Sequence, residues 1–127
     1  MAESKVKGNF TEDKIKPIRI TDKENGAVYE LDFSRDSVKF AEERGFMLEN
    51  VVNFPVTNLP LLFFYAFRKN HKNVPKNRVD SIYDRLGGLS TSFIERLMLL
   101  YDQAQQSNNV LDSDEDMGKN GNLSVEL

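Results

Sequence analysis

The sequence predicts an α+β fold in which an N-terminal β-hairpin packs on about four α-helices. Two apolar runs flank Asn25-Gly26, a dipeptide that favours the positive backbone angles of a tight hairpin turn. The length of 127 residues fits one domain, since domains of about 100 to 150 residues can bury a core of their own. We expect a flexible arm over residues 1–14, the domain over residues 15–102 and a disordered acidic tail over residues 103–127.

The hairpin is predicted to join strands over residues 15–21 and 27–33. A two-residue turn at Asn25-Gly26 pairs Ile20 with Leu31, Ile18 with Phe33, and Arg19 with Asp32. This register buries one apolar face and pairs opposite charges on the other face. Pro17 lacks a backbone donor, so it belongs at the start of the strand or on an edge.

The first helix is predicted over residues 35–44. Ser34 can cap its N-terminus, and Val38 and Ala41 are expected to point inward. Gly45 marks the end of the helix, because glycine takes the left-handed conformation at low cost.

Residues 47–55 are predicted to form an extended connector, because Pro55 disfavours helix in the residue before it. Thr57 can then cap a helix over residues 58–69. Apolar residues lie on nearly every side of this helix: Leu59, Leu61, Leu62, Phe63, Phe64, Tyr65, Ala66 and Phe67. Such a helix is either central in the core or lends one face to a partner.

Two further helices complete the predicted domain. One begins at Pro75 and stops at Gly87-Gly88. Its residues at the helical repeat are Val79, Ile82, Tyr83 and Leu86. The last helix begins at Ser90 or Ser92, and Ser92 with Glu95 has the spacing of a capping box.

Charge divides the chain near Asp102. From Asp102 onward, six acidic residues and one lysine give a net charge of −5, and the sixteen basic and fourteen acidic residues before it give +2. Apolar residues become few after Gln103. We therefore expect disorder there, because the tail cannot bury enough surface to offset its ordering entropy.

No residue pattern points to catalysis. The absence of cysteine excludes disulfides and cysteine-bound zinc, and it is compatible with a reducing cytoplasm. We interpret His71, the single histidine, as a solvated residue near a helix C-terminus. Asp80 and Asp84 could share a metal, but the neighbouring arginines favour a solvated charged face. We predict no enzyme activity, no cofactor and no metal.

The sequence also predicts no membrane association. Its one strongly apolar segment, residues 59–67, is far shorter than the roughly 20 residues that span a bilayer. The N-terminus is charged and lacks the apolar run of a secretory signal.

A basic stretch without acidic residues lies between Glu49 and Asp80. Its members are Arg68, Lys69, Lys72, Lys76 and Arg78. Three interpretations stay open: a solvated face, which we favour, a dock for an acidic protein segment, and a nucleic-acid contact. The last is the least favoured, because the domain as a whole is only weakly basic.

Three segments carry a resemblance to a known family: YELDFSRDSVKFAEERGF (residues 29–46), LPLLFFYAFRKNHKNV (residues 59–74) and VDSIYDRLGGL (residues 79–89). Together they resemble the small tail assembly chaperones of long-tailed, siphovirus-type phages and prophages of Gram-positive bacteria. The resemblance covers about residues 18–101 and supplies no catalytic residues. It implies a homo-oligomer in the cytoplasm of the bacterial host that binds the tape measure protein, recruits the major tail tube protein and is absent from the mature virion.

Two alternatives to a chaperone stay open, namely a structural tail or neck component retained in the virion and a small nucleic-acid-binding regulator. The expected partner-binding residues are Phe46, Val51, Phe54, Leu62, Phe63, Tyr65, Arg68, Lys69 and Lys72. The resemblance also implies a longer product made by minus-one ribosomal frameshifting. Met117-Gly118-Lys119-Asn120 can be encoded by a slippery heptamer, so we expect the frameshift there.

Overall fold

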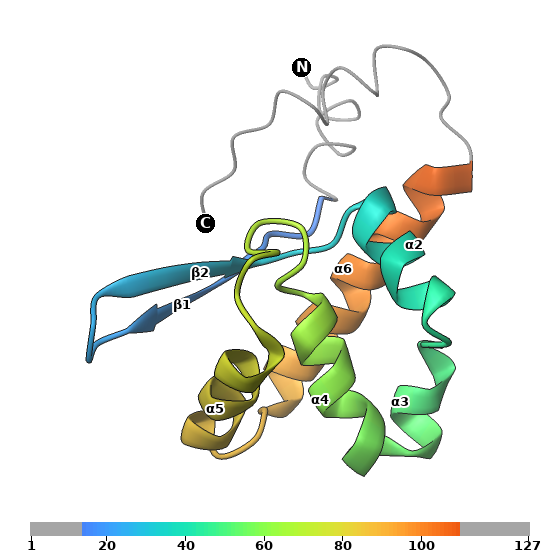
Figure 1. The fold of residues 1–127 in the computed structure, drawn as a ribbon. Coiled ribbons are helices and arrows are strands. Elements are labelled where there is room, and N and C mark those ends of the chain that lie inside the picture. The colour runs from blue at the N-terminus through green and yellow to red at the C-terminus, as the bar shows by residue number, and fades with distance from the viewer. Residues whose placement is uncertain (1–13, 110–127) are drawn as a thin grey trace, which may run out of the picture.

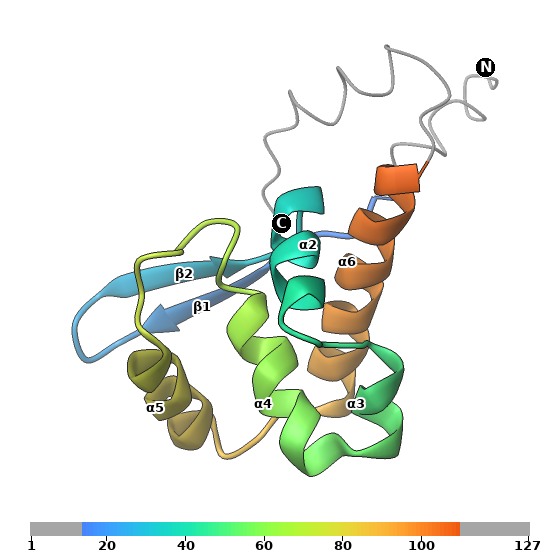
Figure 2. The same cartoon turned by 45° about the vertical axis from the view of Figure 1, so that its right-hand side comes forward.

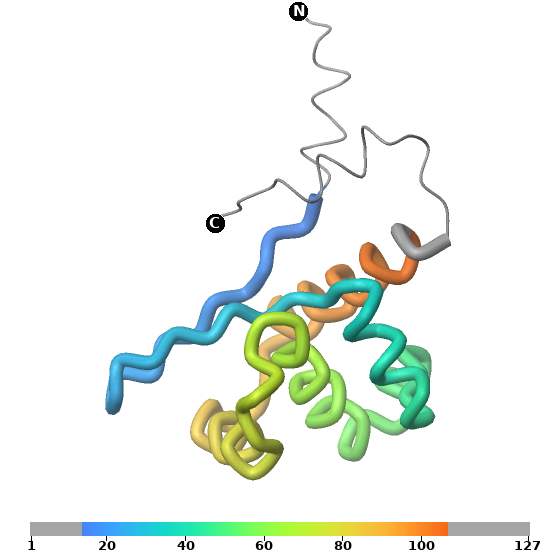
Figure 3. The backbone as a smooth tube through the Cα atoms, turned by 45° about the horizontal axis from the view of Figure 1, so that its top comes forward, coloured from blue at the N-terminus to red at the C-terminus, as the bar shows by residue number. Residues whose placement is uncertain are grey.

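The computed structural model describes residues 14–109, with side chains as far as residue 106. These residues form an antiparallel hairpin followed by five helices (Figure 1). The elements are β1 (Ile18–Asp22), β2 (Ala27–Leu31), α2 (Arg35–Glu43), α3 (Glu49–Asn53), α4 (Pro55–Tyr65), α5 (Lys76–Leu86) and α6 (Thr91–Asn109). The hairpin projects from a helical body (Figure 3). The predicted α+β class is confirmed, with one helix more than the sequence indicated.

The hairpin turn has four residues, because Asp22 pairs with Ala27. Gly26 takes a φ of 78° and donates its N–H to the Asp22 carbonyl over 2.7 Å. The predicted two-residue turn is therefore wrong. The observed register pairs Ile18 with Leu31, Arg19 with Glu30 and Ile20 with Tyr29. It differs from the predicted register by two residues, and an even shift leaves every side chain on its expected face.

An ion pair between Arg85 and Asp22 fastens the hairpin to α5. The Arg85 guanidinium donates to both carboxylate oxygens of Asp22 over 2.8 and 2.9 Å. These hydrogen bonds, together with the Glu24 N–H, lower the pKa of Asp22 to about 2. A two-stranded hairpin is only marginally stable by itself, so this contact helps to hold it on the helices.

The ends of α2 follow the prediction. Ser34 caps the helix by accepting from the Ser37 N–H over 3.2 Å, and Ser37 completes the capping box from its own side. Val38 and Ala41 are fully buried. Gly45 follows the helix with a φ of 86°, which confirms it as the residue that allows the chain to leave the helix.

The predicted extended connector is wrong, because residues 49–53 form the short helix α3. Only Phe54, with φ −136° and ψ 68°, leaves the helical conformation. Pro55 restricts the one residue before it and then begins α4 as a first-turn proline. Consequently α4 starts three residues earlier than predicted, and it ends at Tyr65 instead of residue 69.

Helix α4 lies at the centre of the body, in contact with α2, α3, α5 and α6 (Figures 1 and 2). Leu62 and Phe63 are fully buried. The ring of Phe63 lies 5.2 Å from that of Phe67 and 5.3 Å from that of Tyr83. Of the two positions that the sequence allowed for this helix, the central one is observed.

Helix α5 begins after Pro75 and ends at Gly87, which has a φ of 75°. Val79 and Ile82 are buried as predicted, Tyr83 is half-buried, and Leu86 is exposed.

Helix α6 starts at Thr91, and the hydroxyl of Ser90 accepts from the Phe93 N–H over 3.2 Å. Ser92 therefore lies inside the helix, and the capping box predicted for it with Glu95 is wrong.

Helix α6 continues to Asn109, seven residues beyond the predicted end of the domain at residue 102. The Gln103 side-chain oxygen accepts from the Ile15 N–H over 2.8 Å, and Ala104 is buried. Both residues were predicted to belong to the tail, and both are part of the fold. The rest of the predicted tail, the arm up to residue 13 and the frameshift site lie outside the described residues.

None of the helices within residues 14–109 has both the length and the apolar composition needed to cross a membrane.

Candidate functional site

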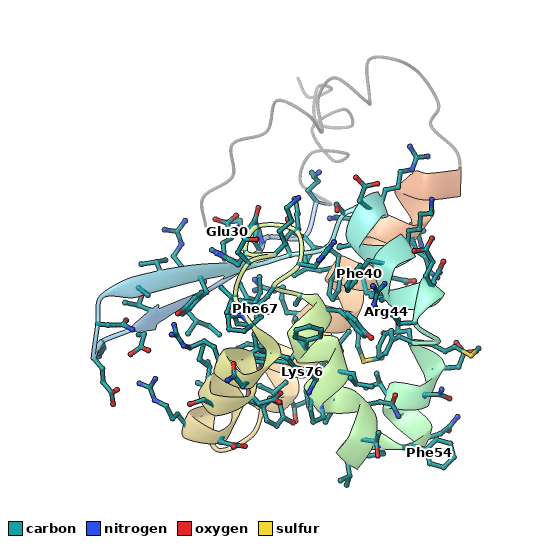
Figure 4. All side chains as sticks on the ribbon, viewed as in Figure 1. Glu30, Phe40, Arg44, Phe54, Phe67 and Lys76 are labelled. Carbon is teal, nitrogen blue, oxygen red and sulfur yellow. The ribbon has the colours of Figure 1, made fainter. Side chains whose placement is uncertain are left out.

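Four large apolar side chains are exposed over residues 47–56, from the segment before α3 to the first turn of α4. The exposed fraction is 50% for Met47, 69% for Val52, 64% for Phe54 and 89% for Val56. We call these four residues the apolar corner. Phe54 points outward at the end of the body remote from the hairpin (Figure 4). Exposed apolar residues that cluster in this way mark interaction sites more often than scattered ones do.

A groove of about 610 Å³ adjoins the apolar corner, between the start of α3 and one side of α6. Its apolar lining comes from Phe46, Met47, Leu48, Val52, Met98 and Tyr101. Its acidic lining residues are Glu42, Glu49 and Asp102. Burial, with a smaller contribution from the Glu42 carboxylate, raises the pKa of Tyr101 to about 12, so its hydroxyl stays neutral. An apolar groove with carboxylates at its edge suits a segment that is both apolar and basic.

A second depression of about 410 Å³ lies between α2 and residues 68–72. We call it the basic pocket. Its lining consists of Ser34, Asp36, Ser37, Lys39, Phe40, Glu43, Arg68, Lys69 and Lys72. Lys69 forms an ion pair of 2.7 Å with Asp32. The pocket thus brings together three of the basic residues that the sequence had singled out.

The ring of Phe40 lies between two arginines. The guanidinium carbon of Arg44 is 3.6 Å from the ring centroid and that of Arg68 is 3.8 Å from it. Two guanidinium groups cannot share one position above a ring, so they cover opposite faces. Phe40 and Arg44 lie side by side in Figure 4. Cation–π contacts of this kind hold Arg68 in one place at the surface.

The comparisons with known proteins give one match. The sequence profile of the family described as "Domain of unknown function (DUF5055)" matches residues 1–127. The chain belongs to this family. No curated protein and no solved structure matches this DUF5055 chain.

The DUF5055 structure divides the predicted partner-binding residues into two groups. Five are in the core: Phe46, Val51, Leu62, Phe63 and Tyr65. These five side chains contribute little to the surface of the monomer, although Phe46 also lines the groove. Four are accessible: Phe54 in the apolar corner, and Arg68, Lys69 and Lys72 in the basic pocket.

The expected partner-binding residues did not include three residues of the apolar corner, Met47, Val52 and Val56. The available signal was the mixture of apolar residues with asparagine and threonine over residues 47–58. Such a segment carries apolar side chains, and no neighbouring element was predicted to cover them.

The other two residues of the basic stretch lie on α5. Lys76 forms an ion pair of 3.0 Å with Asp80, and Arg78 lies close enough to Asp22 to lower the pKa of that carboxyl. The stretch is therefore divided between two places and interleaved with carboxylates, an arrangement that does not favour nucleic acid. Residues 14–109 contain no group of three His, Asp or Glu that could hold a metal ion.

His71 is not the solvated residue that the sequence predicted. Its Nε2 atom accepts from the Glu30 N–H of β2 over 2.9 Å, and its ring lies 5.4 Å from that of Tyr29. Asn70 donates to the Glu30 carbonyl over 3.1 Å. Burial lowers the pKa of His71, and Glu30 opposes this in part. The imidazole therefore fastens the segment after α4 to the hairpin.

Proposed function

We propose that this DUF5055 domain is an assembly chaperone that binds an apolar segment of another protein. The observation that carries the proposal is the apolar corner, where Val52, Phe54 and Val56 are each more than half exposed. Exposed apolar side chains add nothing to the stability of the monomer, and a partner that covers them removes apolar area from water.

The client is a helix with basic side chains. The groove beside the apolar corner has an apolar floor with Glu42, Glu49 and Asp102 at its edge. A groove of this composition fits an amphipathic helix that inserts its apolar face and places lysine or arginine near the carboxylates.

The resemblance to tail assembly chaperones supplies the identity of the clients. On that basis the groove holds the tape measure protein, and the complex recruits the major tail tube protein in the cytoplasm of the bacterial host. Mass spectrometry of purified virions separates this proposal from a retained tail or neck component, since a chaperone is absent from the finished particle.

Binding to overlapping tape measure fragments from the same phage genome tests the proposal. Replacing Val52 and Phe54 by glutamate is expected to weaken binding at least about tenfold, the equivalent of ~1.4 kcal/mol. Val28→Glu is the matched control, because Val28 is also an exposed apolar residue but lies on β2. Equal affinity of the wild type and the double variant for every fragment would overturn the proposal.

A further inference from the structure

The basic pocket has the opposite charge to a segment of the same chain outside the described residues. Its lining includes four cationic side chains, Lys39, Arg68, Lys69 and Lys72, and two carboxylates, Asp36 and Glu43. The sequence of residues 112–116 is Asp-Ser-Asp-Glu-Asp, which places four carboxylates within five residues.

Two of the four cations lack a carboxylate among the described residues. Lys69 pairs with Asp32 at 2.7 Å, and Lys39 lies 3.9 Å from Glu43. Within residues 14–106, no carboxylate lies within 4.0 Å of the nitrogens of Arg68 or Lys72. The Arg68 guanidinium contacts the Phe40 ring and also lines the pocket, and a guanidinium has five N–H donors with which to bind a carboxylate.

The chain after α6 is long enough for the acidic segment to reach the pocket. Helix α6 packs on α2 (Figure 2). Helix α2 forms one wall of the pocket, and Gln105 Nε2 donates to Glu42 Oε2 over 3.4 Å. After α6 ends at Asn109, residues 112–116 lie three to seven positions further along. At about 3.3 to 3.6 Å per extended residue, the chain can cover ~10 to 25 Å. A helix with its side chains is only about 10 to 12 Å wide, so this length suffices to pass over α2.

We propose that the acidic segment, residues 112–116, docks into the basic pocket of its own chain. A surface ion pair between separate molecules is weak. A short tether, however, gives the segment an effective concentration in the millimolar range, so several weak pairs suffice. The docked segment covers Arg68 and Lys72 and blocks access of other anions, including nucleic acid, to this face. This inference does not depend on the proposed chaperone function.

A spin label provides the test, because the chain has no cysteine of its own. Ser113→Cys in the full chain accepts a nitroxide between the carboxylates without changing the charge. We expect the label to broaden the backbone amide signals of residues 36–40 and 68–72 at low salt. The broadening should disappear in ~1 M NaCl, where the Debye length is only ~3 Å.

Charge reversal shows which groups are responsible. Lys72→Glu and the double variant Arg68→Glu/Lys72→Glu should abolish the broadening, and Lys23→Glu in the hairpin turn should preserve it. Lys72→Glu leaves the Phe40 stack intact, so it remains informative if the double variant unfolds. The proposal is overturned if broadening is absent at low salt, if it survives Lys72→Glu, or if it arises only from labelled molecules mixed with unlabelled ones that carry ¹⁵N. The last outcome would assign the pocket to the tail of a second copy.

Discussion

At the scale of the residue, Phe63 shows how the core depends on aromatic side chains from different elements. Its fully buried ring lies within 6.0 Å of the rings of Phe67 after α4, Tyr83 on α5 and Phe93 on α6. We expect Phe63→Ala to lower the free energy of unfolding by about 3 to 5 kcal/mol, because it leaves a cavity that these neighbours cannot fill. Urea denaturation measures the loss.

Two neighbouring positions serve as controls for that measurement. Phe64 is half-buried, with the Lys76 ammonium 5.8 Å from its ring, so alanine there should cost less. Phe54 is exposed in the apolar corner, and alanine there should leave the urea midpoint nearly unchanged. Equal losses at Phe63 and Phe54 would contradict the observed packing.

His71 makes stability depend on pH. The neutral imidazole accepts from the Glu30 N–H, and protonation removes that acceptor. Burial lowers the pKa of His71 in the folded state below the unfolded value of about 6.5. The stabilisation is therefore complete above about pH 6.5 and decreases as the pH falls from there through the folded-state pKa.

A variant that cannot titrate isolates this effect. His71→Gln should show a smaller decrease in urea midpoint between pH 7.5 and pH 5 than the wild type, since the contribution of the other groups is common to both proteins. Parallel pH profiles of the two proteins would show that the imidazole does not contribute.

At the scale of the element, helix ends set by local contacts were predictable from the sequence. Ser34 caps α2 with its own hydroxyl, and Gly87 ends α5 through a backbone conformation that glycine adopts easily. The faces of the hairpin were also predictable, because alternation of side chains survives a shift of two residues. The turn length was not, because the Asp22 side chain accepts from the Glu24 N–H and supports a longer turn.

Helix α3 was not predictable because it has five residues and no side-chain cap. A helix that short is held by its neighbours and leaves no periodic pattern.

The candidate site was also only partly predictable from the sequence, because its walls come from different elements. The basic residues 68–72 were visible in the sequence, but the α2 wall of their pocket depends on tertiary packing. The apolar character of α4 was visible too, but not the four helices that bury it.

The C-terminal part of α6 belongs to the fold. Ala104 is buried and Gln103 bonds to the backbone of Ile15. We expect truncation after Asn109 to leave the melting temperature nearly unchanged, because any pairs that residues 110–127 make with the surface are weak. Truncation after Asp102 should lower the free energy of unfolding by about 1 to 3 kcal/mol, mainly by leaving the Ile15 N–H without its acceptor. Calorimetry on both truncated chains measures the difference. Equal melting temperatures would show that the domain ends at residue 102, as the sequence predicted.

At the scale of the whole molecule, the apolar corner and the basic pocket lie at different ends of the helical body. The corner is formed by residues 47–56, which run from the segment before α3 to the first turn of α4, and the pocket by α2 and residues 68–72. One surface suits an apolar and basic partner and the other an acidic segment. Binding at the corner therefore need not displace whatever occupies the pocket.

The apolar corner also predicts how the chain associates with itself. A stable interface buries about 800 Å² on each partner, more than the roughly 300 to 600 Å² of a typical exposed apolar patch. Association through the corner alone should therefore be weak, and sedimentation velocity should show an average mass that rises with protein concentration. Replacing Val52 and Phe54 by glutamate should abolish this rise, whereas Val28→Glu should not, because Val28 lies on the hairpin. A client helix that occupies the same surface should likewise return the chain to the monomer, since the two partners compete for one site. Monomeric behaviour of the wild type up to ~1 mM, where association would provide only about 4 kcal/mol, would contradict the predicted homo-oligomer and leave the corner to the client alone.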